Sequence, residues 1–180
     1  MTRLALVRLT LSALAWGAEW SEPASVLHEF KPCVTYRAAV FKDWLIVEAS
    51  LAPGWHTFVM DNERRAAEKL AGKPSLGIDQ PTQITADSGL EITGAWRQSE
   101  PKDFSKPQIR WYSWGYQDRA LFAAPVRLPG GQPVRLRIRG QACTDTTCKN
   151  VDVTLTAPVS VQSPLAAAGI DPSRLIPVRP

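Results

Sequence analysis

Apolar and polar residues alternate with a period of two along much of the chain. The clearest case is residues 134–139, where Val, Leu and Ile alternate with Arg135, Arg137 and Arg139. Residues 151–156 repeat the pattern, with Val and Leu set against Asp and Thr. Because successive side chains of a strand point to opposite faces, each segment predicts a strand with one buried face. The three arginines are expected on the solvated face.

Six further segments are bounded by turn residues such as Pro53-Gly54 and Pro129-Gly130-Gly131. They predict strands over residues 34–41, 44–51, 55–60, 83–86, 90–96 and 119–128. About eight short strands separated by turns are typical of an all-β domain, and we predict an antiparallel β-sandwich.

Two segments depart from this pattern. Asp61 could be the N-cap of a helix over residues 62–71, with Gly72 following its C-terminus, and an irregular loop is the alternative. Prolines recur from Pro158 to the end of the chain and would interrupt any regular element. We therefore expect residues 162–180 to form a tail that leaves the domain.

Composition is that of an ordinary globular protein. Hydrophobic residues make up 44% of the 180 residues and charged residues 21%, which excludes a disordered or coiled-coil chain. The 15 prolines and 11 glycines disfavour long helices. Charged residues interrupt every apolar run before it reaches the ~18 residues that a membrane span needs, so we expect no membrane span.

The N-terminus has the features of a secretory signal peptide over residues 1–18. A basic start precedes a mostly apolar stretch, and Gly17 and Ala18 stand just before the first acidic residue. An N-terminal helix or a mis-assigned start is the alternative. Cleavage would remove Arg3 and Arg8 and no acidic residue, which lowers the formal net charge of +4 by two. The basic pI of about 9.1 therefore gives no reason to expect nucleic-acid binding, and we expect a periplasmic or secreted protein.

Cys143 and Cys148 enclose a four-residue turn between two predicted strands. Residues that face each other across an antiparallel pair have Cα atoms about 4.5 to 5.5 Å apart, within the range of a disulfide. A bridge across so short a loop contributes only about 2 kcal/mol, which favours a bridge whose role is to open and close. Structural disulfides of this kind also occur in secreted domains, and a metal site, although a poor match, is a third alternative.

Cys33 lies within a predicted apolar strand. A buried, unreactive thiol is expected there, and pairing with another molecule is the alternative. Its position about 15 residues past the predicted cleavage site argues against a lipid anchor.

Three segments resemble one known family. Residues 141–148 (QACTDTTC) and the alternating strand after them are similar to the cysteine hairpin of the N-terminal periplasmic domain of DsbD-type thiol:disulfide interchange proteins. Residues 51–58 (LAPGWHTF) resemble the Gly-aromatic turn of this family, and residues 116–121 (YQDRAL) its Tyr-x-Asp-Arg entry into a late strand. The order of the segments agrees from roughly Ser25 to Val161, and we assign residues 19–161 to this domain.

The resemblance implies an immunoglobulin-like sandwich whose cysteine pair carries out thiol–disulfide exchange. Cys148 would form the mixed disulfides and Cys143 would resolve them. The resemblance also implies a thioredoxin-like or DsbD/CcdA-like membrane electron donor, with oxidised periplasmic thiol proteins as clients. We expect no cofactor and no metal.

Four aromatic or imidazole side chains, His56, Phe58, Phe104 and Tyr116, are candidates to support the pair, and Trp111 is an alternative to one of them. In this family a loop caps the disulfide with an aromatic ring, and here we predict Phe104 for that ring, with Trp111 as the next candidate. His56 and Phe58 share a strand face that the family places near the cysteines, so His56 is a candidate proton acceptor. Tyr116, from the Tyr-x-Asp-Arg segment, is a further candidate. Ordinary packing of these rings is the alternative.

The chain also departs from the family. Lys149 and Asn150 follow the second cysteine where members often have a proline, and the spacer between the cysteines is one residue shorter than in the best-known members. No membrane electron carrier or thioredoxin-like module follows, so we expect a stand-alone copy that meets its reductant in trans. The alternative function is a non-catalytic secreted β-sandwich binding module with a structural disulfide. A hydrolase is excluded, since the chain has no Gly-x-Ser-x-Gly turn.

Overall fold

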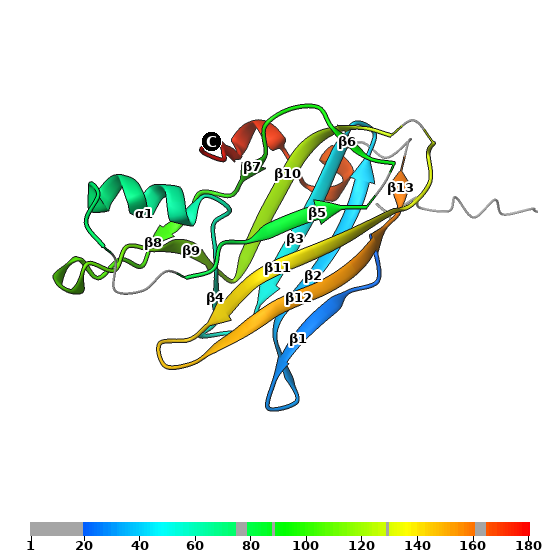
Figure 1. Cartoon of the computed structure of the whole chain (residues 1–180). Coiled ribbons are helices and arrows are strands. Elements are labelled where there is room, and N and C mark those ends of the chain that lie inside the picture. The colour runs from blue at the N-terminus through cyan, green and yellow to red at the C-terminus, as the bar shows by residue number, and fades with distance from the viewer. Residues whose placement is uncertain (1–19, 75–78, 88, 129, 161–164) are drawn as a thin grey trace, which may run out of the picture.

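Two β-sheets packed face to face form the body of the molecule, with one short α-helix at one end (Figure 1). The computed structural model describes residues 20–180 except residues 75–78, 88, 129 and 161–164. The signal peptide predicted over residues 1–18 lies outside the described residues. The all-β sandwich predicted from the alternating segments is confirmed.

The larger sheet has eight strands among the described residues, in the order β1-β2-β3-β10-β7-β14, with β13 beside β2 and β6 beside β10. Its strands pair antiparallel except for β13, which runs parallel to β2. They are β1 (Ala24–His28), β2 (Lys31–Phe41), β3 (Trp44–Leu51), β6 (Glu91–Ile92), β7 (Arg97–Gln98), β10 (Arg119–Arg127), β13 (Val159–Ser160) and β14 (Ile176–Pro177).

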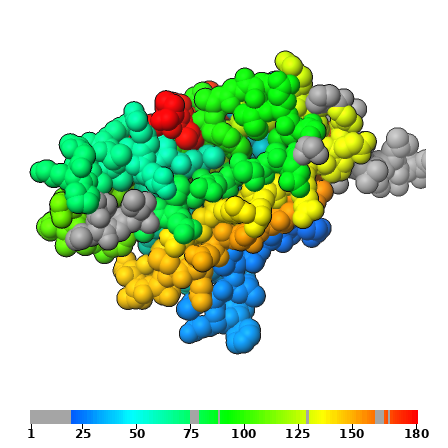
Figure 2. All heavy atoms as spheres, viewed as in Figure 1, coloured from blue at the N-terminus to red at the C-terminus, as the bar shows by residue number. Residues whose placement is uncertain are grey.

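The smaller sheet has six strands in the described part of the chain, in the order β12-β11-β4-β9-β8, with β5 beside β11. All of its pairs are antiparallel. Its strands are β4 (His56–Phe58), β5 (Gln83–Ala86), β8 (Lys102–Asp103), β9 (Trp114–Gln117), β11 (Val134–Cys143) and β12 (Cys148–Ala157). Figure 2 shows the yellow and orange end of the β11–β12 hairpin beside the blue β1–β2 hairpin at the lower edge of the molecule.

The core lies between the sheets and follows the period-two pattern. On β11, Val134, Leu136 and Ile138 are buried, while Arg135, Arg137 and Arg139 are exposed as predicted. Arg137 forms an ion pair with Asp152 of β12, which turns the predicted solvated face into a row of surface ion pairs. Cys33 is buried in the same core, and its thiol donates to the carbonyl oxygen of Val26. Burial raises the pKa of the Cys33 thiol, in keeping with the unreactive cysteine that was predicted.

The C-terminal segment packs on the domain, so the prediction of a tail that leaves it is wrong. Ile170 and Leu175 are buried against the outer face of the larger sheet, in contact with Phe41 and Ile46. Strand β14 pairs with β7 at the sheet edge, where Pro177 fits because an edge strand does not need every backbone N–H. Short 3₁₀ turns precede it, at Leu165–Ala168 and Pro172–Arg174. Prolines thus limited the segment to short elements without excluding it from the core.

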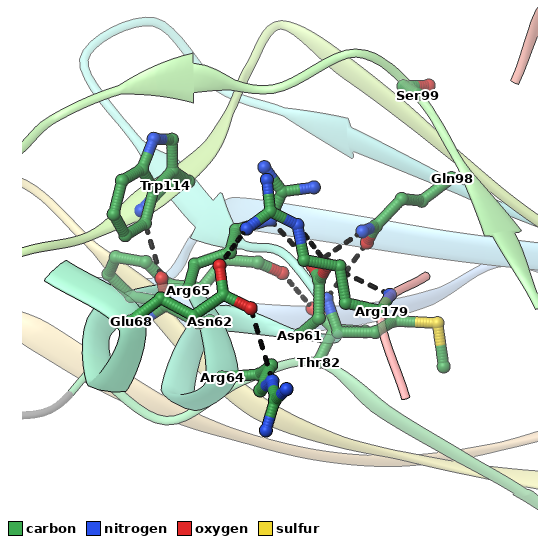
Figure 3. A network of polar contacts seen from close by, with 12 residues as sticks. Asp61, Asn62, Arg64, Arg65, Glu68, Thr82, Gln98, Ser99, Trp114 and Arg179 are labelled. Atoms are coloured by element: carbon green, nitrogen blue, oxygen red, sulfur yellow. Dashed lines mark hydrogen bonds and ion pairs between the residues drawn. The ribbon is translucent and has the colours of Figure 1, made fainter. Parts of the chain in front are cut away.

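Helix α1 (Asn62–Leu70) occupies the predicted position with Asp61 as its N-cap residue, but the Asp61 side chain makes no capping hydrogen bond. The Asp61 carboxylate, with no exposed side-chain area, instead accepts hydrogen bonds from Arg65 Nε at 2.9 Å, Gln98 Nε2 at 2.7 Å and the backbone N–H of Arg179 at 3.1 Å (Figure 3). Burial acts to raise the pKa of Asp61, but these hydrogen bonds outweigh it and hold the pKa below its ordinary value. One carboxylate therefore joins the helix to β7 and to the C-terminal segment. No helix of the described residues is long and apolar enough to cross a membrane.

Candidate functional site

Strands β11 and β12 pair in continuous register from Val134 and Ala157 to Cys143 and Cys148. The backbone N–H of Thr144 donates to the carbonyl oxygen of Thr147 at 2.8 Å, and its hydroxyl accepts from the N–H of Thr147 at 3.1 Å. These bonds close the turn between the cysteines. The position of the two cysteines therefore follows from the strand ladder and the turn, which do not depend on a bond between the sulfurs.

Cys143 and Cys148 form a disulfide, with their Cα atoms 4.0 Å apart. The two residues differ in accessibility: Cys143 is 2% exposed, whereas Cys148 is an exposed residue. An incoming thiolate therefore reaches Cys148 more readily than Cys143.

The strand register places several side chains on the same face as Cys143. Cys143 pairs with His56 of β4, and His56 pairs in turn with Gln117 of β9. Two residues further along the same strands, Phe58 pairs with Gly115. Because directly paired residues point to the same side of a sheet, this face carries the imidazole, the Phe58 ring and the buried cysteine together.

Phe104 follows β8 and extends that face. Its backbone N–H donates to the carbonyl oxygen of Ser113, and its ring centroid lies 4.8 Å from that of His56. The His56 ring is also 5.3 Å from Phe58. A Cβ atom on Gly115 would lie 3.1 Å from the Phe104 ring and 2.1 Å from the carbonyl oxygen of Thr57. A side chain cannot be accommodated at position 115, and its absence leaves the space that the Phe104 ring occupies.

These residues enclose a cavity of about 520 Å³ whose wall includes the disulfide. The structure brings three of the four predicted supporting residues, His56, Phe58 and Phe104, to this cavity together with both cysteines. Trp111, the second candidate for the capping ring, is also in the wall. The other lining residues are Gly54, Asp79, Lys106, Ser113, Gln117, Thr144, Asp145, Thr146 and Thr147.

Tyr116 lies elsewhere, and its prediction as a site residue needs correction. It follows Gly115 on β9 and so points to the opposite face of the sheet, into the core. Its ring packs edge-on against Phe122 at 5.7 Å, and its hydroxyl donates to the carbonyl oxygen of Ser99 at 3.1 Å. Tyr116 contributes to the core that supports the cavity and does not line it.

Apart from His56 and Trp111, the polar residues of the cavity wall beyond the hairpin were not predicted. The Trp111 indole N–H donates to the carboxylate of Asp79 at 2.8 Å, and the Lys106 ammonium lies 4.8 Å from the Trp111 ring centroid. Ser113, which directly precedes β9, and Gln117 within it share the cavity face with Gly115 because the three stand at alternate positions along the chain. That alternation was the available signal, but the strand over Trp114–Gln117 was not among those predicted.

Electrostatics at the site favour a neutral imidazole. Burial lowers the pKa of His56 from its ordinary value, although the carboxylates of Asp79 and Asp145 act to raise it. His56 is therefore uncharged at neutral pH and able to accept a proton. The described residues contain no cluster of three or more His, Cys, Asp or Glu side chains that could bind a metal ion.

Comparison with known proteins gave one family match. The family model described as "Thiol:disulfide interchange protein DsbD, N-terminal" matches residues 25–160. Among solved structures, a reduced DsbD N-terminal domain from Neisseria meningitidis is 14% identical, covers 70% of this chain and 86% of that one, and gives a TM-score of 0.45. A complex between the DsbD and PilB N-terminal domains of the same organism gives 16% identity, 72% and 88% coverage and a TM-score of 0.43. The comparison with curated proteins gave no match.

Proposed function

The chain belongs to the family of N-terminal domains of the thiol:disulfide interchange protein DsbD, and from this premise we propose that it relays electrons through the Cys143–Cys148 pair. One observation carries the proposal: the bridge joins a buried cysteine to an exposed one at the wall of a cavity that Phe104 also lines. A bridge with only a stabilising role would not need the exposed end.

The reductive half of the reaction begins at Cys148. A thiolate of the donor attacks the sulfur of Cys148, the bond to Cys143 breaks, and Cys143 leaves as a thiolate. A second thiol of the donor then attacks the mixed disulfide and releases Cys148. The donor dithiol becomes a disulfide, and the pair gains two electrons and two protons.

The oxidative half runs in the opposite direction on a client. The Cys148 thiolate attacks the client disulfide and forms a mixed disulfide, which Cys143 resolves by attacking the sulfur of Cys148. The client leaves as a dithiol, and the Cys143–Cys148 bridge is restored. Cys143 is suited to the second step because its buried position keeps it from external disulfides but leaves it beside Cys148.

His56 supports the step at Cys143. Only a few per cent of a thiol with a pKa near 8.5 is ionised at neutral pH, so a nearby proton acceptor speeds the attack. His56 is the residue paired with Cys143 across the β4–β11 ladder, and its imidazole is neutral at this pH. We assign it the proton that Cys143 releases when it resolves the mixed disulfide and regains when the bridge opens.

The proposed partners come from the family to which the chain belongs. We propose a thioredoxin-like protein or a DsbD/CcdA-like membrane protein as the donor, and oxidised thiol proteins of the periplasm as the clients. Lys149 and Asn150, which replace the proline segment of many family members, lie next to Cys148 and would contribute to a partner surface specific to this chain.

Redox titration of the purified protein tests the function. We expect a reduction potential above the roughly −300 mV typical of structural disulfides, because the bridge ends at the exposed Cys148 and exposed disulfides have the higher potentials. The fraction of reduced pair is measured by alkylation and mass spectrometry in glutathione or dithiothreitol buffers. A bridge that stays closed in the native protein under excess dithiothreitol would instead indicate the binding module with a structural disulfide.

The Phe104→Ala substitution tests the cap. Removing the ring should speed reduction of the bridge by 2-mercaptoethanol several-fold, because the disulfide would lose its steric cover. The stability should fall by only about 1 kcal/mol, since the ring is half-buried and less is lost than for a core aromatic residue. Stopped-flow reduction and urea unfolding measure the two effects.

Phe30→Ala is the matched control for this substitution. Phe30 stands at the tip of the β1–β2 hairpin, is 97% exposed and does not line the cavity. The control should be reduced at the wild-type rate. If Phe104→Ala is also reduced at that rate, Phe104 is not the cap.

A further inference from the structure

Two polar groups in the cavity wall, the Ser113 hydroxyl and the Lys106 ammonium, form neither a side-chain hydrogen bond nor an ion pair with any described residue. The hydroxyl oxygen of Ser113 is buried and forms no hydrogen bond with any described residue. Lys106 is exposed and forms no ion pair among the described residues, and its ammonium lies over the face of Trp111. Buried hydroxyls are normally paired, because an unpaired one is unfavourable. A hydroxyl donor and an unpaired cation on one wall are the groups that bind a carboxylate.

Phe104 lies beside Ser113 in the cavity wall. Phe104 and Ser113 are cross-strand neighbours, joined by the hydrogen bond from the Phe104 N–H to the Ser113 carbonyl oxygen. Their side chains therefore lie next to each other on the cavity face. Both residues line the cavity whose wall includes the disulfide, so a ligand in this cavity would lie near the bridge and the two polar groups together.

Asp79 supplies a charge of the opposite sign on the same wall. One of its carboxylate oxygens accepts the Trp111 indole N–H, and the residue is largely buried. Together with Asp145, it makes the cavity unfavourable for a ligand that carries only negative charge. A ligand with one ammonium and one carboxylate would match both Asp79 and Lys106.

We propose that the cavity is a subsite for a low-molecular-weight amino-acid thiol, such as free cysteine or a short peptide of cysteine. The proposal rests on the exchange function proposed above and adds a small-molecule substrate to it. The carboxylate would bind Lys106 and Ser113, the ammonium would face Asp79, and the sulfur would reach Cys148. A volume of about 520 Å³ is in the range of small-molecule sites.

The exchange with such a thiol balances without any further reactant. The thiolate attacks the sulfur of Cys148, the Cys143–Cys148 bond breaks, and Cys143 takes up a proton. A second molecule of the thiol then attacks the sulfur of the first within the mixed disulfide. The two small molecules leave as a symmetric disulfide, and Cys148 is released and takes up the second proton. Two thiols lose two electrons in total, and the bridge gains them. The reverse reaction would reduce the symmetric disulfide at the expense of the Cys143–Cys148 dithiol.

Reduction of the bridge by matched small thiols tests the subsite. Cysteine and cysteamine share the thiol and the ammonium and differ in the carboxylate, while 3-mercaptopropionate lacks the ammonium. Rates are measured by stopped flow and divided by the thiolate concentration. We expect cysteine to react about three- to five-fold faster than either analogue, the size of effect that one partly exposed ion pair gives. Equal rates for the three thiols would overturn the proposal.

Variants then show which residues cause the faster reaction with cysteine. Lys106→Gln and Ser113→Ala should each bring the cysteine-to-cysteamine rate ratio close to one. Ser113→Ala should fold at least as stably as the wild type, since the hydroxyl that it removes has no partner. Lys102→Gln is the control: its ammonium donates to Gln117 Oε1 at 3.0 Å, it does not line the cavity, and it should keep the wild-type ratio.

The outcomes separate the subsite from the exchange function. The proposal is wrong if Lys106→Gln keeps the wild-type rate ratio, or if Lys102→Gln lowers the ratio as much as Lys106→Gln does. In either case this wall does not bind the carboxylate of cysteine. The exchange function would still stand if dithiothreitol opens the bridge in those same variants. A bridge that no thiol opens would overturn both.

Discussion

Cys148→Ser should lower the rate of thiol–disulfide exchange to that of the buffer alone. The exposed cysteine is the one that an external thiol or disulfide can reach, and Cys143 is 2% exposed and cannot replace it. The measurement is the reduction of a small disulfide by the chemically reduced protein, followed by the release of thiol. Exchange at an appreciable fraction of the wild-type rate would show that Cys143 is the attacking residue.

Cys143→Ser is the matched control for this substitution. It leaves the Cys148 thiol in place without a resolving partner, so mixed disulfides with a client or a small thiol should accumulate and be visible by mass spectrometry. Both variants lose the same bridge and about 2 kcal/mol of stability with it. The difference between them therefore reports the roles of the two sulfurs and not a difference in folding.

Asp61→Ala should lower the stability by about 3 kcal/mol, more than either cysteine substitution. The Asp61 side chain is fully buried and accepts hydrogen bonds from Arg65, Gln98 and the backbone of Arg179 (Figure 3). Its removal leaves the Arg65 guanidinium, with only 10% of its side chain exposed, without a counter-charge. Urea unfolding followed by tryptophan fluorescence measures the change.

The pH dependence provides a second test of the same carboxylate. Its pKa is lower in the folded protein than the ordinary value of 3.8, so its contribution is complete above that pH and is lost as the pH falls through the folded pKa. The stability difference between wild type and Asp61→Ala should therefore shrink on acidification below pH 3.8. Asp61→Asn keeps an acceptor oxygen and should lose less at neutral pH. A difference that stays constant down to low pH would mean that the charge of Asp61 contributes nothing.

The long strands could be predicted because they bury one face over many residues. The strands predicted over residues 44–51 and 83–86 have the bounds that the structure shows. Strand β11 begins at the predicted residue and extends past the predicted segment only at its C-terminal end. Strands of two residues, such as β7 and β8, contain no alternation and were missed. Asp61 has the local sequence of a helix cap, but its partners Gln98 and Arg179 are remote in sequence. Only the folded structure brings them to it.

The candidate site was partly predictable, because its cysteines stand in a long hairpin and some of its other residues in segments that resemble the family. The hairpin spacing identified Cys143 and Cys148, and the family resemblance selected His56, Phe58 and Phe104. Resemblance gives the order of segments but not the face of each residue, which is why Tyr116 was placed at the site although it points into the core. Asp79, Lys106 and Ser113 stand in short or irregular segments, and their meeting in one wall depends on the pairing of β8 with β9.

The register that continues to the last pair of β11 and β12 also determines how long an intermediate can live. The ladder and the Thr144 turn hold Cys143 beside Cys148 whether or not the sulfurs are joined. When Cys148 carries a partner, the resolving thiol is therefore present at an effective concentration far above the millimolar values of a flexible linker. Resolution becomes an intramolecular event, and the partner is released almost as soon as it is captured. The short hairpin thus favours rapid turnover of many encounters over a long-lived complex with any one of them.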